Sequence, residues 1–356
     1  MDEKIHLKGL NGLRAIAALG VVWSHTGSSD FPFLYTLHLG LAQYSVTLFF
    51  ALSGFLITYL LFVEKERTGI SIKSFYIRRI LRIWPIYFLY LLAAVISISI
   101  YHPGVLPGSL PYYLFLAANI PPVMLTSLPY LGHYWSLGVE EQFYLFWPWI
   151  IKKSTHVLKA LIIFTAAFFA LKLFFRFVYF QWGNITPLYV TSTFRFDCMA
   201  MGGMAALLCL QGHRLFLKIV THRITEIICW LSLGLMAADW FYITPMLNHE
   251  LAAVVGIGLI VNQSFNKKPL INLENHFFDF MGRLSYGIYV IHPLVIFYYS
   301  RLINGIDLDP LLRSILAYGG AIILSTGVAW ISYEFYEKRF LRLKVRFSQV
   351  NSSDSM

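Results

Sequence analysis

The chain alternates between long apolar runs and short segments that hold most of its lysines and arginines. A membrane-spanning helix needs about 20 mainly apolar residues, and ten runs approach that length. These runs cover residues 9–27, 40–62, 80–101, 133–151, 157–180, 196–212, 223–243, 248–264, 279–299 and 311–333. The pattern therefore predicts an all-α, polytopic transmembrane helical domain with about 10 spans.

The basic residues of the loops predict how these spans are oriented. They precede the first span, recur in every second loop and close the chain. Examples are Lys8, Lys73, Lys152, Lys218, Lys267 and Arg342. Because loops rich in lysine and arginine stay in the cytoplasm, we expect both termini there. A crossing by the proline-containing segment 112–124 would invert every later loop, so we expect this segment to be re-entrant or interfacial.

Charged residues are too few for a water-soluble protein of this size. They make up 13% of the 356 residues, and hydrophobic residues make up 58%, whereas a soluble domain carries about 25% charged residues. An ordinary cytosolic enzyme, a disordered chain and a disulfide scaffold are therefore excluded. The net charge of +10 reflects basic loops facing a lipid bilayer and predicts no nucleic acid partner. We expect one membrane domain over residues 1–340 and a short basic and polar cytoplasmic tail over residues 341–356.

Several ionisable side chains lie inside the predicted spans, where each costs about 2.5–3.5 kcal/mol and usually marks a functional interior. Arg14 and His25 are eleven residues apart, so they share one helix face and are separated by about 16 Å along the axis. Arg79 and Arg82 also share a face, and their planar guanidinium groups suit phosphate. His133 and Glu140 lie two turns apart on one face of the fourth span.

Each of these positions also has a structural interpretation. A histidine such as His25 can bond between helices, and arginines at the start of a span can simply anchor it. Arg195 and Asp197 could form an interfacial salt bridge, and His292 could serve packing. Glu337 lies in a charged segment that favours a solvated face. The histidines lack the spacing of metal ligands, so we predict no metal site.

Five motifs, in order along nearly the whole chain, resemble those of the integral-membrane acyltransferase 3 family. They are N-G-L-R-A-I-A-A-L-G-V-V-W-S-H (11–25), S-V-T-L-F-F-A-L-S-G-F-L-I-T (45–58), F-Y-I-R-R-I-L-R-I-W-P (75–85), Y-W-S-L-G-V-E-E-Q-F-Y (134–144) and S-Y-G-I-Y-V-I-H-P (285–293). Residues 333–340 are similar to the family's closing glutamate segment. Each match is weak alone, but together they make the chain similar to members of this family along nearly its whole length.

The resemblance implies an enzyme, an O-acyltransferase of the bacterial inner membrane. Such an enzyme moves an acyl group, usually acetyl, from cytoplasmic acyl-CoA to a hydroxyl of a cell-surface sugar. Typical acceptors are the O-antigen of lipopolysaccharide, capsule, exopolysaccharide or a glycolipid. Acyl-CoA, here acetyl-CoA, is a co-substrate. Many relatives carry an additional hydrolase-like domain. We expect none in this protein, which would then act alone, as a homo-oligomer or with a glycan-assembly partner.

The resemblance also assigns roles to single residues. The family's essential histidine falls on His25, which we expect to be catalytic together with Glu140. Its arginines fall on Arg14, Arg79 and Arg82, which we expect to bind the acyl-CoA donor. The supporting residues are expected to be Trp135, Ser136, Glu141, Arg195, Asp197 and His292.

Two positions depart from the family pattern. Asn11 and Thr47 stand where relatives often have aspartate. Because Asn11 carries no charge, we expect Glu140 or Asp197 to orient the ring of His25. The ring would then take the proton of the acceptor hydroxyl during direct transfer, or would itself carry the acyl group as an intermediate.

Two other classes of protein fit part of the pattern. A transporter or flippase of a glycan-related solute also has many spans, buried charges and a broken helix, as Pro293 suggests. It would be expected to show inverted repeats, and the sequence shows none. A structural membrane scaffold would explain the spans but not the histidines and glutamates within them.

Overall fold

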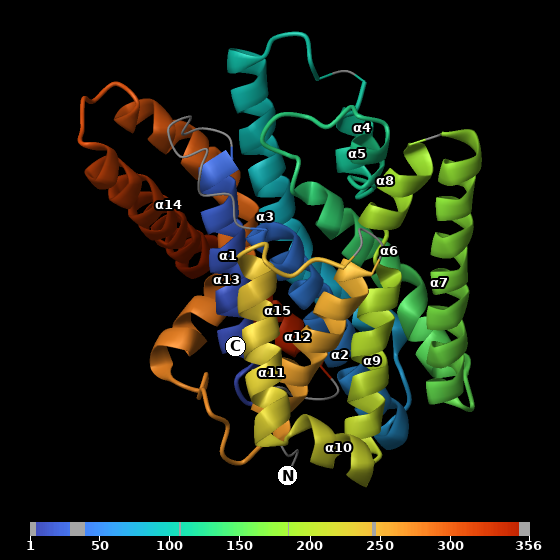
Figure 1. Cartoon of the computed structure of the whole chain (residues 1–356). Helices are drawn as coiled ribbons and strands as arrows, with labels where there is room; N and C mark the ends of the chain where they lie inside the picture. Colours follow the sequence, from blue (N-terminus) through green and yellow to red (C-terminus); the bar gives the residue numbers. More distant parts are fainter. Residues whose placement is uncertain (1–4, 29–39, 107, 184, 244–246, 349–356) are drawn as a thin grey trace.

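The computed structural model describes residues 5–28, 40–106, 108–183, 185–243 and 247–348, which form helices joined by loops (Figure 1). The predicted all-α class is confirmed. The longer helices are α1 (Leu10–Ser28), α2 (Leu41–Arg67), α3 (Ile72–Tyr101), α6 (Tyr134–Lys153), α7 (Val157–Trp182), α9 (Phe196–Leu210), α11 (Arg223–Ala237), α12 (Asn248–Phe265), α13 (His276–Ile303) and α14 (Pro310–Ser332). The shorter ones are α4 (Leu110–Leu114), α5 (Ile120–Val123), α8 (Thr186–Thr193), α10 (Arg214–Val220), the π-helix η2 (Tyr333–Glu337) and α15 (Lys338–Val345).

Within the described ranges, six helical segments are long and apolar enough to cross a membrane. They are α2, α3, α7, α13, the α8–α9 segment from Tyr189 to Leu210 and the continuous segment from α14 to α15. A seventh exists if α10 and α11, bent by 57° at their junction, form one span. The protein is therefore a multi-pass membrane protein. The total of ten spans and the cytoplasmic side of both termini stay predictions.

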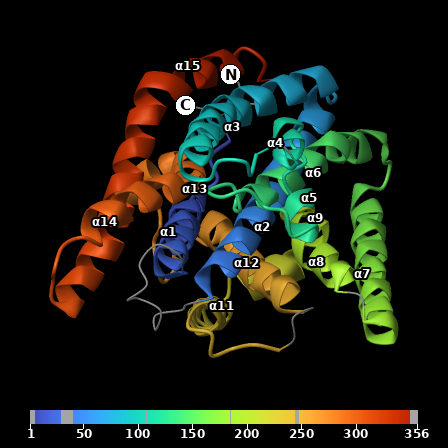
Figure 2. The same ribbon diagram turned by 90° about the horizontal axis from the view of Figure 1, so that it is seen from above.

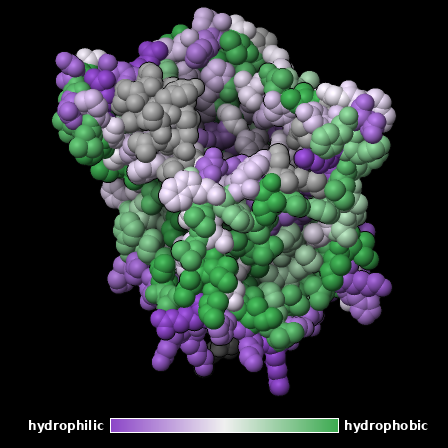
Figure 3. Space-filling view, in the orientation of Figure 1, coloured by the Kyte–Doolittle hydropathy of each residue, from purple (hydrophilic) through white to green (hydrophobic). Residues whose placement is uncertain are grey.

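The helices are arranged around a central pair, α1 and α2. Helices α13 and α14 pack against α1, and α9 and α12 pack against α2 (Figure 2). Helix α7 packs on α9 at the edge of the molecule. Its Ile163, Phe174 and Phe180 are more than half exposed, as expected for a helix surrounded by lipid. Hydrophobic surface accordingly forms a band across the molecule, with hydrophilic side chains gathered at the lower end (Figure 3).

Glycines let α2 and α9 approach backbone to backbone. A Cβ atom added to Gly54 would lie 1.8 Å from the carbonyl oxygen of Met199. One added to Gly202 would lie 2.2 Å from that of Ala51. Small residues at a helix interface give membrane helices close van der Waals packing. This contact fixes α2, which carries residues of the site described below.

The segment 112–124 does not form a spanning helix, in agreement with the sequence. It contains only the last residues of α4 and the four-residue α5. The buried Asn119 exchanges two hydrogen bonds with Gln142 of α6, at 3.0 and 2.8 Å. The segment is thus held against α6 by a side-chain amide pair.

The end of the helical domain differs from the solvated face predicted there. The π-turn of η2 directs Glu337 inward, where the side chain is 8% exposed and accepts a hydrogen bond from Ser332 Oγ at 3.1 Å. Glu334, by contrast, pairs with Lys338 at 2.7 Å and stays partly exposed. The predicted domain boundary after residue 340 falls inside α15 and stays a prediction.

Candidate active site

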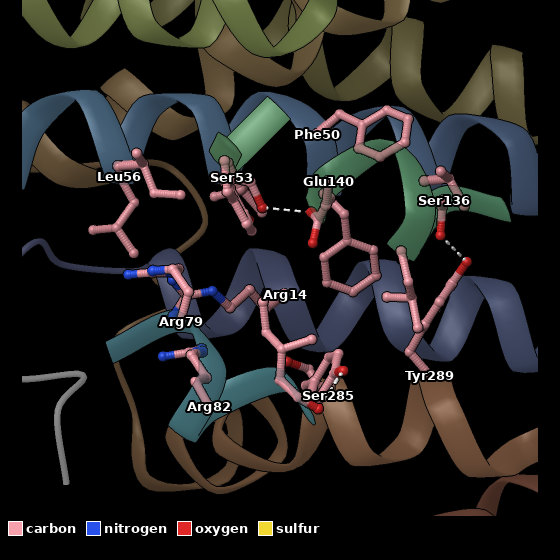
Figure 4. Close-up of a pocket in the computed structure, with 18 residues that line it drawn as sticks. Arg14, Phe50, Ser53, Leu56, Arg79, Arg82, Ser136, Glu140, Ser285 and Tyr289 are labelled. Carbon is pink, nitrogen blue, oxygen red and sulfur yellow. Dashed lines mark hydrogen bonds between the residues drawn. The ribbon is translucent and has the colours of Figure 1, made fainter. Parts of the chain in front are cut away.

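One cavity, which we call the arginine cavity, is enclosed by α1, α2, α3, α6 and α13 (Figure 4). Arg14, Arg79 and Arg82 contribute its cationic groups, and Glu140 contributes a carboxylate. Arg79 and Arg82 both extend from α3, one turn apart (Figure 4). The predicted donor-binding residues are therefore brought together in one place.

Two aromatic rings lie beside the guanidinium group of Arg79. Its guanidinium carbon lies 5.7 Å from the ring centre of Phe75 and 5.6 Å from that of Tyr144. Among the described residues, no hydrogen-bond partner reaches its buried Nε. A buried cationic donor without an acceptor is costly, so an anionic ligand would compensate it.

The neighbours of Arg79 have their own partners. Arg14 donates from Nη1 to Oδ1 of Asn11 at 3.0 Å. Glu140 accepts a hydrogen bond from Ser53 Oγ at 2.7 Å across the α2–α6 interface. Glu140 therefore lies among the arginines, where its charge partly balances theirs.

A second cavity of about 550 Å³, which we call the histidine cavity, lies farther along α1. His25, His133, Trp135 and Arg195 line it. Nδ1 of His25 lies 2.7 Å from Nε2 of His292. The ring centres of His133 and His292 are 5.2 Å apart. Imidazoles from α1, from the residue preceding α6 and from α13 therefore meet at this point.

Metal binding does not follow from this cluster. Nε2 of His133 contacts the carbonyl oxygen of Val290 at 3.0 Å, and Nδ1 of His292 contacts that of Tyr289 at 2.7 Å. Across the part of the chain that the structure describes, no group of three or more His, Cys, Asp or Glu is arranged to hold a metal ion. Two of the three imidazoles thus contact backbone carbonyl oxygens of α13.

Tyr289 and Val46 line both cavities. The Tyr289 hydroxyl donates to the carbonyl oxygen of His133 at 2.9 Å and lies within hydrogen-bond distance of Ser136 Oγ. Ser136 itself lines the arginine cavity. The junction between the cavities is therefore formed by a hydrogen-bonded tyrosine from α13 and a valine from α2.

Arg195 and Asp197 do not pair with each other as the sequence suggested. Arg195 donates to Thr47 Oγ1 at 2.9 Å and lies over the ring of Trp135, with its guanidinium carbon 5.0 Å from the ring centre. Asp197 instead contacts Lys172 of α7 at 2.6 Å. Asp197 therefore belongs to a separate buried ion cluster.

The expected orientation of His25 also differs from the contacts found. Glu140 lies in the arginine cavity and Asp197 contacts Lys172, whereas the hydrogen bond of His25 that the structure describes is to His292. The neutral side chain at position 11 faces Arg14 rather than His25. The departure from the family pattern at Asn11 thus concerns an arginine and not the histidine.

Glu141 lies outside both cavities. It accepts a hydrogen bond from Nε1 of Trp84 at 3.1 Å, which joins α6 to α3. Two residues had not been singled out from the sequence, Ser53 of the arginine cavity and Lys172 of the separate ion cluster. Ser53 carried no signal beyond its place in a motif. Lys172 is a lone lysine in an apolar run, and the rule for ionisable residues in spans would have found it.

Comparison with known proteins gives the family. Residues 7–334 match the model of a family described as an acyltransferase domain. This chain belongs to the acyltransferase 3 family. The match covers every helix of this acyltransferase domain that lines the two cavities.

The acyltransferase domain is similar to curated proteins of Staphylococcus aureus. It is 25% identical to "O-acetyltransferase OatA" of strain NCTC 8325 / PS 47, over 93% of this chain and 57% of the relative. It is 27% identical to "Putative O-acetyltransferase SAR0937" of strain MRSA252, over 98% of this chain and 59% of the relative. The chain thus spans somewhat more than half the length of these relatives. No solved structure shows a significant match.

Proposed function

We propose that the protein is a membrane O-acetyltransferase that moves an acyl group, acetyl by preference, from cytoplasmic acyl-CoA to a hydroxyl of a cell-surface sugar. The acceptor would be a glycan of the kind found in O-antigen, capsule or exopolysaccharide. One observation carries the proposal: an arginine cavity and a histidine cavity meet at Tyr289, and Arg14 and His25 of the same helix line one each. The names of the relatives support the acetyl group.

The arginine cavity is the proposed site for the phosphates of CoA. Arg79 and Arg82 present two guanidinium groups from one face of α3, and Arg14 adds a third from α1. Bonds between arginine and phosphate are charge-assisted and can be bidentate. The buried Nε of Arg79 would gain an acceptor when the donor binds.

The charge of the surrounding surface supports entry of the donor from the cytoplasm. Arg14 lies near the beginning of α1. The chain just before α1 contacts the end of α12, because the backbone carbonyl oxygen of Lys8 accepts a hydrogen bond from Ser264. The exposed Lys267 and Lys268 follow α12 at that end. An excess of basic residues marks the cytoplasmic side of a membrane protein.

The proposed reaction uses His25 as the base. The acceptor oxygen bonds to the acyl carbon, its proton passes to His25, and the carbon–sulfur bond of the thioester breaks. The CoA thiolate leaves and takes the proton from His25, which restores the neutral ring. A positioned base of this kind contributes roughly 10²–10⁴ in rate.

A two-step route uses the same residues. His25 would attack the thioester carbon as the carbon–sulfur bond breaks and the CoA thiolate leaves, and would carry the acyl group as acyl-imidazole. The acceptor oxygen would then take the acyl group from the ring, and its proton would pass to the thiolate. Incubation with labelled acetyl-CoA in the absence of acceptor separates the routes, because only the two-step route leaves label on the protein.

Glu140 is proposed to act on the donor side. Its carboxylate lines the same cavity as Arg79 and accepts a hydrogen bond from Ser53. It would keep the guanidinium groups separated and aligned before the donor phosphates arrive. Trp135 and Arg195 would form the wall of the histidine cavity that faces the acceptor.

The test is the release of free CoA thiol by purified protein in lipid, with acetyl-CoA and a surface-glycan acceptor. We expect His25→Ala to lower the rate by at least about 10² while the variant still inserts and elutes as a single species. Wild-type turnover by His25→Ala would refute the assignment of the base. Mass spectrometry of surface glycans from cells with and without the protein should show one added acetyl group per modified sugar.

A further inference from the structure

Pro293 leaves a backbone carbonyl of α13 without its helical partner. In an α-helix, the N–H of residue 293 would donate to the carbonyl oxygen of Tyr289, and proline has no N–H. Nδ1 of His292 lies 2.7 Å from this oxygen and 3.2 Å from that of Ile288. A carbonyl oxygen can only accept, so Nδ1 of His292 carries the hydrogen.

The position of this hydrogen determines which nitrogen of the neighbouring His25 ring carries a hydrogen. A neutral imidazole with its hydrogen on Nδ1 has a lone pair on Nε2. Nε2 of His292 lies 2.7 Å from Nδ1 of His25. One of these two nitrogens must donate, and only His25 can, so Nδ1 of His25 carries a hydrogen and the lone pair of its neutral ring is on Nε2.

The opposite tautomer of His25 is excluded by the same distance. It would place two lone pairs against each other at 2.7 Å. His292 cannot rotate away from the contact easily, because its side chain is fully buried and its other nitrogen is bound to the helix backbone. The contact also suits the protonated state, because the His25 imidazolium keeps an Nδ1 hydrogen that points at an acceptor.

We propose that His292 and Pro293 act as positioning residues that hold His25 in the tautomer with its basic lone pair on Nε2, and that they keep an acceptor for the imidazolium formed during transfer. Pro293 releases the Tyr289 carbonyl, this carbonyl fixes the His292 tautomer, and His292 fixes that of His25. The assignment of His25 as the base rests on the proposed function, but the tautomer itself does not.

The first test measures the tautomer directly, without substrate. The protein is labelled with ¹⁵N-histidine, reconstituted in lipid and examined by solid-state NMR, and the His25 signals are assigned by their loss in His25→Ala. We expect a protonated Nδ1 and an unprotonated Nε2. A wild-type His25 ring with its hydrogen on Nε2 overturns the proposal.

Two substitutions then separate the hydrogen bond from packing. His292→Gln keeps an amide oxygen that can accept from Nδ1 of His25 and an amide N–H that can reach the Tyr289 carbonyl. His292→Leu fills the site without an acceptor. We expect kcat to fall roughly 10- to 100-fold in His292→Leu and less than about tenfold in His292→Gln, with KM for acetyl-CoA unchanged in both. Equal losses in the two variants contradict the proposal.

Pro293→Ala tests the first step of the relay. The restored N–H competes for the Tyr289 carbonyl, so we expect the NMR spectrum of His25 to show both tautomers while the protein stays folded. An unchanged spectrum removes Pro293 from the proposal. If the tautomer is as expected but neither the wild-type protein nor any variant releases CoA, the proposed function is refuted and the tautomer assignment stands. If His25→Ala is inactive and His292→Leu has wild-type kcat, only the positioning role fails.

Discussion

Arg14 and His25 lie on one face of α1, eleven residues apart, and each lines a different cavity. Their separation along the helix axis is about 16 Å. The arginine is near the beginning of α1 and the histidine near its end. A single helix therefore carries a residue of the proposed donor site and the proposed base, and substitutions at the two ends should affect different kinetic constants.

Arg79→Ala should raise KM for acetyl-CoA by about 10- to 100-fold with a smaller change in kcat, because it removes charge-assisted bonds to the donor phosphates. Steady-state kinetics with varied acetyl-CoA measures this. Arg78→Ala is the control, since Arg78 pairs with Glu64 at 2.8 Å and does not line the cavity. If both variants keep the wild-type KM, the arginines serve only to anchor α3.

Glu140→Gln should change KM for acetyl-CoA more than kcat, because Glu140 lies among the arginines and accepts from Ser53. If Glu140 instead oriented His25, kcat would fall and KM would not change. Ser53→Ala should shift KM in the same direction to a smaller extent. If Glu140→Gln changes kcat alone, Glu140 acts on His25 and not on the donor.

Thr47→Asp should keep most of the activity, and Thr47→Val should lose more of it. Thr47 Oγ1 accepts a hydrogen bond from Arg195 at 2.9 Å, and an aspartate can accept from the same group. Valine has a similar shape but no acceptor, which leaves a buried donor unsatisfied at about 1–3 kcal/mol. Thermal unfolding and thiol release, measured on both variants, check this order, and the reverse order would contradict it.

Lys172→Met should destabilise the protein by about 3–5 kcal/mol, because removing one member of a buried ion cluster leaves the others uncompensated. Lys172 is 3% exposed and contacts Asp197 and Glu250, each at 2.6 Å. Thermal unfolding in detergent measures the loss as a lower Tm. Lys159→Met, at an exposed position of the same helix, is the control and should leave Tm almost unchanged.

The sequence predicted the helices and the separation of Arg14 from His25 along one helix, because apolar runs and helix periodicity act locally. It could not predict the neighbour of His25, since His292 is 267 residues away along the chain and meets it only through the packing of α1 on α13. Sequence distance contains no information about which ring nitrogen faces which.

The position of Glu337 shows a second reason why the sequence could not predict every side-chain environment. An α-helix turns about 100° per residue, and a π-turn changes this phase. The charges of the surrounding segment predict a solvated face for Glu337, whereas η2 directs it inward. Asn11 and Thr47 were singled out as departures from the family pattern, and the structure adds their partners, Arg14 for Asn11 and Arg195 for Thr47.

The ion cluster of α7 has a consequence for biosynthesis. Lys172 is made before both of its carboxylate partners, which lie on α9 and α12. While α9 and α12 are still being synthesised, Lys172 has neither carboxylate partner. Because an unpaired lysine is costly inside the bilayer, we expect α7 to stay beside the translocon or at the membrane–water interface, with its lysine in contact with water. Pairing of Lys172 thus depends on the synthesis of two later helices, so α7 completes its packing only after α12 has been made.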